Sequence, residues 1–130
     1  MARNFICLVI DDDDDDGMFF QAAFTQLGTT SHCWLSPGCQ QAIQRVDLGQ
    51  EPVPDYIFLD LQLGAATVKE SLDLLKSHQS ISTAQIIILS GADPAYQADW
   101  LNSRGIFKII QKQASIGLLA DQIKQVLSLS

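Results

Sequence analysis

Short runs of apolar residues alternate along this chain with longer segments whose apolar residues recur at helical spacing. Residues 5–10, 56–59 and 86–89 are rich in Ile, Leu, Val and Phe, and each run ends directly on a polar residue. A fourth run covers 106–110, and Cys33-Trp34-Leu35 forms a shorter one. Continuous apolar runs of this length are typical of strands that are buried on both faces of a parallel sheet. We therefore predict five strands.

The segments between these strands are predicted to be helices. Phe20, Ala23, Phe24 and Leu27 have helical spacing, and Pro37 begins a second helix that runs to about Val46. The remaining helices are expected from Thr67, whose spacing to Glu70 fits a capping box, from Asp93 to about Asn102, and after a capping Ser115. Five strand–helix units predict an α/β fold in which helices cover both faces of one parallel sheet. A length of 130 residues suits a single domain, 1–130.

The composition excludes several classes of function. The net charge is −7, with only 8 Lys and Arg, so a basic face for direct nucleic-acid binding is not expected. No apolar stretch approaches the roughly 18 residues of a membrane span, and the apolar run after the N-terminus is too short for a secretory signal. Three cysteines form no CxxC pair, which favours free thiols in a reducing cytoplasm.

Polar residues stand where the predicted strands end. Asp11, Asp60 and Ser90 directly follow or end three apolar runs, and Lys112 comes soon after the fourth. Parallel strands direct these ends to one edge of the sheet, where α/β proteins bind their ligands. Carboxylates that meet at one place repel each other unless a cation joins them. The residues therefore predict a site for a divalent cation such as Mg²⁺ and for a phosphoryl group.

These features together resemble the receiver domain of bacterial response regulators over essentially the whole chain. The matched features are the acidic pair Asp11-Asp12 after the first strand, Asp60 in Phe-Leu-Asp-Leu, Ser90-Gly91 30 residues later, and Lys112 after a further 22 residues. The tail, with Lys112-Gln113-Ala114-Ser115, looks most like the receivers of LuxR-type regulators. The resemblance implies a flavodoxin-like three-layer sandwich with strand order 2-1-3-4-5.

The resemblance also implies a role for each site residue. Asp12 and Asp60 would ligate Mg²⁺ directly, Asp11 would act through water, and the Gln62 carbonyl would add a backbone ligand; a shift of register by one would make Asp13 a ligand instead. Asp60 would be the phosphoacceptor, with Lys112 and Ser90 contacting the phosphoryl group. The remaining aspartates, Asp13 to Asp16, are expected to be solvated residues that cap the first helix.

The implied function is two-component signal transduction. The protein would accept a phosphoryl group from a histidine kinase or phosphotransfer protein, and would catalyse only its own phosphorylation and dephosphorylation. The added charge would then switch a surface on the fourth helix, fifth strand and fifth helix. That surface carries Tyr96 and Trp100, and it would contact a second copy or an output domain that controls transcription.

Four positions depart from the usual receiver pattern. Gly64 and Gln113 stand where many receivers have Pro, and Val68 stands where Gly is usual; we predict a trans bond before Gln113. At the switch position, Ile109 replaces the usual aromatic residue. These departures favour an alternative, a pseudo-receiver that binds partners without phosphorylation. A Mg²⁺-dependent phosphatase is disfavoured, because it would need Asp rather than Gln62 two residues after the nucleophile.

Overall fold

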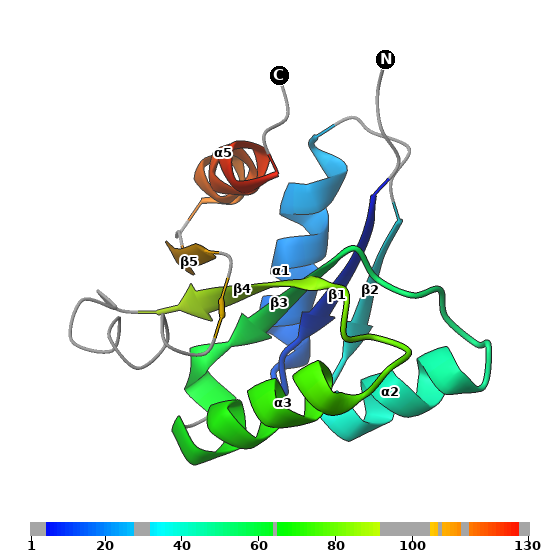
Figure 1. Cartoon of the computed structure of the whole chain (residues 1–130). Helices are drawn as coiled ribbons and strands as arrows, with labels where there is room; N and C mark the ends of the chain where they lie inside the picture. The colour runs from blue at the N-terminus through cyan, green and yellow to red at the C-terminus, as the bar shows by residue number, and fades with distance from the viewer. Residues whose placement is uncertain are drawn as a thin grey trace.

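Five parallel strands form one sheet in the order β2-β1-β3-β4-β5 (Figure 1). The computed structural model describes residues 5–27, 32–63, 65–91, 105–106, 108–112 and 115–127, with residues 65 and 66 described as backbone alone. The strands are β1 (Ile6–Ile10), β2 (His32–Ser36), β3 (Tyr56–Asp60), β4 (Gln85–Ser90) and β5 (Lys108–Gln111). The predicted strand number and order are therefore confirmed.

Helices cover both faces of the sheet, as predicted. Helices α1 and α5 lie on one face, and α2 and α3 lie on the other (Figure 1). Their bounds are α1 (Asp14–Thr25), α2 (Cys39–Asp47), α3 (Ala65–Ser77) and α5 (Ile116–Val126), with a short 3₁₀ turn, η1 (Leu61–Leu63), after β3. The helix expected over 93–102, with Tyr96 and Trp100, lies outside the described residues. Within the described ranges, no helix is both long enough and apolar enough to cross a membrane.

Three element boundaries differ from the prediction. Helix α2 begins at Cys39, after Gly38 at the N-cap, rather than at Pro37. Helix α3 begins at Ala65, so Thr67 lies inside its first turn and cannot cap it; the chain enters the helix almost directly from η1. Strand β5 begins at Lys108 rather than residue 106. Gly105 has a φ of 72°, a left-handed turn conformation, and the pairing with β4 starts only where Ile87 faces Lys108.

The core consists of two apolar layers, one on each side of the sheet. Along β1, Leu8 and Ile10 face α2 and α3, whereas Cys7 and Val9 face α1 and α5. Phe58 of β3 has no exposed surface and packs against Phe20 of α1, with ring centroids 4.6 Å apart. Burial on both faces explains why the central strands are almost entirely apolar before their carboxyl ends; the exception is Gln85 at the exposed start of β4.

The strand register brings the predicted polar residues to one edge. Ile10, which precedes Asp11, pairs with Leu59, which precedes Asp60. Asp60 pairs with Leu89, which precedes Ser90, and Ser90 pairs with Gln111, which precedes Lys112. The polar residues that end the three central strands thus lie side by side at the carboxyl edge of the sheet, with Lys112 following β5 there.

Asp13 caps the helix that begins at this edge. Its Oδ1 accepts hydrogen bonds from the backbone amides of Asp15 at 3.0 Å and Asp16 at 3.3 Å, which confirms the capping role expected of the acidic run. Replacing Asp13 by Ala should lower the free energy of unfolding by about 1 kcal/mol, because two amides of the first turn lose their acceptor. Urea unfolding of Asp13→Ala beside Asp13→Ser, which keeps an acceptor, measures this. Equal losses in both variants would contradict the capping role.

Candidate functional site

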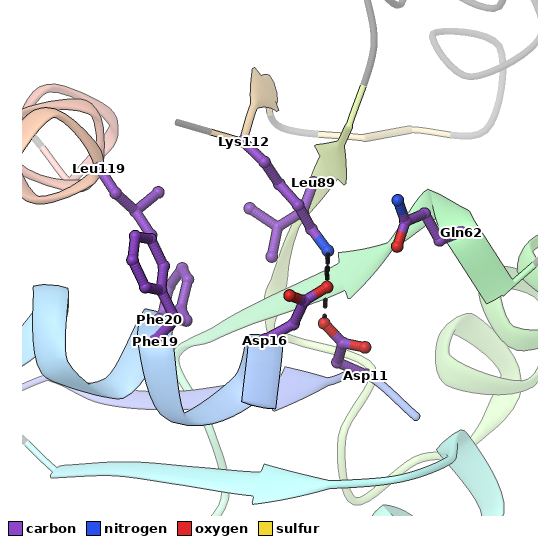
Figure 2. A pocket seen from close by; sticks show the side chains of 8 residues that line it. All are labelled: Asp11, Asp16, Phe19, Phe20, Gln62, Leu89, Lys112 and Leu119. Atoms are coloured by element: carbon purple, nitrogen blue, oxygen red, sulfur yellow. Dashed lines mark hydrogen bonds and ion pairs between the residues drawn. The ribbon is translucent and has the colours of Figure 1, made fainter. Parts of the chain in front are cut away.

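The ammonium group of Lys112 stands among three carboxylates at the carboxyl edge of the sheet. Its Nζ donates to Oδ2 of Asp60 at 2.9 Å and to Oδ2 of Asp16 at 2.9 Å. Oδ2 of Asp11 lies 3.5 Å from the same nitrogen. Figure 2 shows Asp11 and Asp16 pointing toward Lys112 from β1 and α1. Asp11 follows β1, Asp16 lies in α1, Asp60 ends β3 and Lys112 follows β5, so the fold brings the four side chains together.

Backbone amides hold two of the carboxylates in place. Oδ1 of Asp11 accepts from the amide of Asp13 at 2.9 Å, and Oδ1 of Asp60 accepts from the amide of Gln62, also at 2.9 Å. In both residues the other oxygen, Oδ2, faces Lys112. Each of these two carboxylates is therefore fixed by the amide two residues further along the chain, which leaves one oxygen directed into the site.

The site has more negative than positive charge, and it is largely buried. The Asp60 side chain has no exposed surface and that of Asp11 is 3% exposed, against 21% for Lys112 and 40% for Asp16. Burial raises the pKa of Asp11 to about 6. The hydrogen bond from the amide of Asp13 lowers this pKa, and the neighbouring charge of Asp60 raises it. Burial alone would lower the pKa of Lys112, but its hydrogen bonds to Asp16 and Asp60 raise that pKa above its ordinary value.

The donor set fits a hard divalent cation. Asp11, Asp16 and Asp60 each offer a carboxylate oxygen, and these oxygens all lie within 4.8 Å of one another. Carboxylate oxygens are the ligands that Mg²⁺ prefers, and Mg²⁺ keeps several of its waters. A cavity of about 330 Å³ adjoins this cluster and would admit them. Asp11, Asp16 and Lys112 line the cavity together with Gln62, Phe19, Phe20, Leu89 and Leu119 (Figure 2).

The third carboxylate of this cluster belongs to Asp16, whereas the resemblance to receiver domains implied Asp12 as a ligand. Asp12 is exposed and is not one of the three grouped carboxylates, whereas Asp16, expected to be solvated, contacts Lys112. With Asp13 as the cap, Asp12 precedes the helix and Asp16 lies in its first turn. The signal that identifies Asp16 is its spacing: it lies one helical turn before the buried Phe20, on the inward face of α1.

The remaining predicted residues lie around this cluster. Ser90 is the last residue of β4 and is 3% exposed, and its carbonyl accepts the backbone amide of Lys112 at 2.6 Å. The Gln62 side chain lies close to Gly91, where an added Cβ would stand 3.0 Å from Nε2 of Gln62. Ile109 is half-buried on β5 opposite Ile88 and packs on the α2–α3 side of the sheet.

Of the four departures from the receiver pattern, two can be placed. Ile109 packs on the α2–α3 side of the sheet, and Val68 is fully buried in α3. Gly64 and Gln113 lie outside the described residues, so the predicted trans bond before Gln113 stays a prediction. The consequences drawn from all four positions for loop paths and switching also stay predictions.

The chain has the fold of response regulator receiver domains. A crystal structure of the response regulator RPA3017 in red light signalling of R. palustris superposes with a TM-score of 0.80 at 19% identity, over 96% of this chain and 92% of that one. The phosphorylated cyanobacterial phytochrome response regulator RcpA matches with a TM-score of 0.73 at 20% identity, over 95% and 91% of the two chains. The Mn²⁺-bound response regulator Rcp1 matches with a TM-score of 0.75 at 15% identity, over 96% and 93%.

These likenesses are of structure alone. No protein-family model matches the sequence, and no curated protein does. The resemblance to receiver domains, first seen in four motif positions, is confirmed at the level of the fold. The narrower likeness to receivers of LuxR-type regulators stays a prediction.

Proposed function

We propose that this chain is a phosphoaccepting receiver domain, in which Asp60 receives a phosphoryl group and the cluster around it binds Mg²⁺. The observation that supports this best is the contact between Oδ2 of the buried Asp60 and Nζ of Lys112, at 2.9 Å. A carboxylate nucleophile with an ammonium group beside it suits phosphoryl transfer, because the ammonium stabilises negative charge on the transferring group. Two structural neighbours, one phosphorylated and one bound to Mn²⁺, support the same chemistry.

In the proposed reaction the protein mainly positions the Asp60 carboxylate and the phosphoryl group. A lone pair on a carboxylate oxygen of Asp60 attacks phosphorus, an O–P bond forms, and the bond from phosphorus to the leaving group breaks. The amide of Gln62 holds Oδ1 of Asp60 and so restricts the rotation of the carboxylate. Lys112 approaches the oxygens of the transferring group, and Ser90 would donate to one of them. Bound Mg²⁺ would offset the negative charge that collects on the carboxylates and the phosphoryl group.

The proposed donor is a histidine kinase or a phosphotransfer protein, and the proposed location is the cytoplasm. Free thiols at Cys7, Cys33 and Cys39 are compatible with a reducing compartment. We keep Asp12 as a candidate cation ligand because it neighbours Asp11, and the Gln62 carbonyl as a candidate backbone ligand. The partner surface that phosphorylation would switch includes β5 and α5, and through it the domain would act on a second copy or on an output domain that regulates transcription.

One observation favours a pseudo-receiver as a second candidate. The switch position holds Ile109, an aliphatic residue that packs between the sheet and the α2–α3 layer. A β-branched side chain in such a place has few rotamers, so it cannot swing inward with Ser90 as an aromatic ring would. A domain of this kind would bind its partner in one conformation and would not depend on a phosphoryl group.

Incubation with acetyl phosphate separates the two candidates. We expect the intact mass to rise by one phosphoryl group in the presence of Mg²⁺, and to stay unchanged when a chelator removes the cation, because the carboxylates then repel the anionic donor. The adduct should be released by hydroxylamine, as an acyl phosphate is. A protein that gains no mass with Mg²⁺, although calorimetry shows it folded, would favour the pseudo-receiver.

A further inference from the structure

Asp16 differs from the other two carboxylates of the cluster in how it is held. Backbone amides fix Asp11 and Asp60, and both residues are almost fully buried. Asp16 is 40% exposed and stands on α1, and its Oδ2 accepts a hydrogen bond from Lys112 at 2.9 Å. Lys112 is therefore shared between a carboxylate of the sheet and a carboxylate of a helix.

We propose that Asp16 is a positioning residue that keeps the Lys112 ammonium group at the site while the phosphoryl group is transferred to Asp60. This role rests on the proposed phosphoacceptor function, and it goes beyond the roles that the receiver pattern implies for Asp11, Asp12, Asp60, Ser90 and Lys112. Asp16 itself touches neither the phosphoryl donor nor the nucleophile in this role. It acts through its hydrogen bond to Nζ of Lys112.

The reaction changes one partner of Lys112 and leaves the other unchanged. When Asp60 attacks acetyl phosphate, an O–P bond forms, the P–O bond to acetate breaks, and acetate leaves with the electron pair, so no proton is transferred. The carboxylate of Asp60 becomes an acyl phosphate, and Lys112 must move from Oδ2 of Asp60 to an oxygen of the phosphoryl group. Because Asp16 belongs to α1 rather than to β3, its contact with Lys112 can last through this change.

Without this contact, the ammonium group would be held poorly once Asp60 has reacted. Lysine is a strongly hydrated point charge on a stem of four rotatable carbons, so an unpaired ammonium gains both entropy and hydration by turning toward water. In the proposed role Asp11 and Asp60, and not Asp16, would hold the divalent cation, and the cation would further weaken the attraction of those two carboxylates for Lys112. Asp16 then remains as the anionic partner that keeps the ammonium within reach of the phosphoryl oxygens.

The N-cap and the buried face of α1 direct Asp16 toward the site. Its backbone amide is bound by the capping carboxylate of Asp13, which fixes the first turn of α1. One turn later, Phe20 is buried against Phe58 and sets the rotation of the helix about its axis. The inward direction of Asp16 is thus a property of the whole helix rather than of one flexible side chain.

The test is a double-mutant cycle on phosphorylation by acetyl phosphate at saturating Mg²⁺. Asp16→Asn should lower the limiting rate about two- to fivefold, the range for one partly exposed ion pair, with little change in the KM for acetyl phosphate. Asp16→Glu should restore part of the rate. Asp15→Asn is the matched control: it removes the same charge from the same turn, but Asp15 is exposed. In a Lys112→Met background, Asp16→Asn should have no further effect.

The outcomes separate the role of Asp16 from the proposed function. If the wild-type protein takes up no phosphoryl group, the phosphoacceptor function is overturned, and the role of Asp16 with it. If the wild type is labelled but Asp16→Asn slows both backgrounds equally, Asp16 does not act through Lys112. Asp16→Asn could instead raise the Mg²⁺ concentration needed for half the limiting rate. If this rise is equal in the wild-type and Lys112→Met backgrounds, Asp16 is a cation ligand rather than a positioning residue. If Asp15→Asn loses as much of the limiting rate as Asp16→Asn, the effect comes from net charge and not from the contact with Lys112.

Discussion

Replacing Asp60 by Asn is expected to abolish phosphorylation by acetyl phosphate, because the nucleophile is removed. The amide is nearly the same size as the carboxylate, and its oxygen can still accept from the backbone amide of Gln62, so the buried position should keep its shape. It lacks the charged oxygen that would attack phosphorus. Intact-mass measurement with Mg²⁺ and acetyl phosphate, followed by peptide mapping of the modified residue, measures the loss and locates the adduct.

A matched control lies at the other end of the same strand. Asp55 directly precedes β3, and its Oδ2 accepts from the backbone amide of Ile6 at 2.9 Å, a contact that Asn can also make. Asp55→Asn should therefore be labelled as rapidly as the wild type. Label that persists in Asp60→Asn would show that another carboxylate is the nucleophile, with Asp11 and Asp16 as the nearest candidates.

Much of the fold could be predicted because burial constrains strands and helices differently. The central strands are covered on both faces, so they are apolar up to the strand end apart from Gln85 at the exposed start of β4, and the pattern marks β1, β3 and β4 directly. β5 is shorter, and it is exposed at Lys108 and half-buried at Ile109. The predicted start was wrong because Ile106 is apolar without being part of the ladder. Hydrophobicity alone could not show where the turn at Gly105 ends.

Position at a strand end decides which site residues could be predicted from the sequence. Asp60 and Lys112 stand at strand ends, so topology alone brings them together, at 2.9 Å. Asp16 was missed because six identical aspartates give no contrast from which to choose. Only the rotation of α1, set by the burial of Phe20 and Phe24, decides which aspartate faces the sheet. The sequence contained that information, but in the spacing of apolar residues rather than in the acidic run.

Replacing Lys112 by Met should destabilise the protein strongly when no divalent cation is present. The stem of Met can occupy most of the space of the lysine stem, but three carboxylates within 4.8 Å of one another lose the ammonium that compensates them. Removing one partner of a fully buried ion pair costs about 3–5 kcal/mol. Because the Lys112 side chain is 21% exposed, we expect about 2 kcal/mol, measured by urea unfolding with a chelator present.

Mg²⁺ should reverse much of this loss, and that recovery distinguishes charge compensation from lost packing. A cation that binds the folded state alone stabilises it by mass action, and it no longer competes with an ammonium group in the variant. The rise in unfolding free energy on adding Mg²⁺ should therefore be larger in Lys112→Met than in the wild type. Lys108→Met is the control, because Lys108 is exposed on the same strand and should change stability by less than about 0.5 kcal/mol. If Lys112→Met stays destabilised at saturating Mg²⁺, the lysine supports the fold through packing, and the carboxylates do not form the cation site that the proposed function requires.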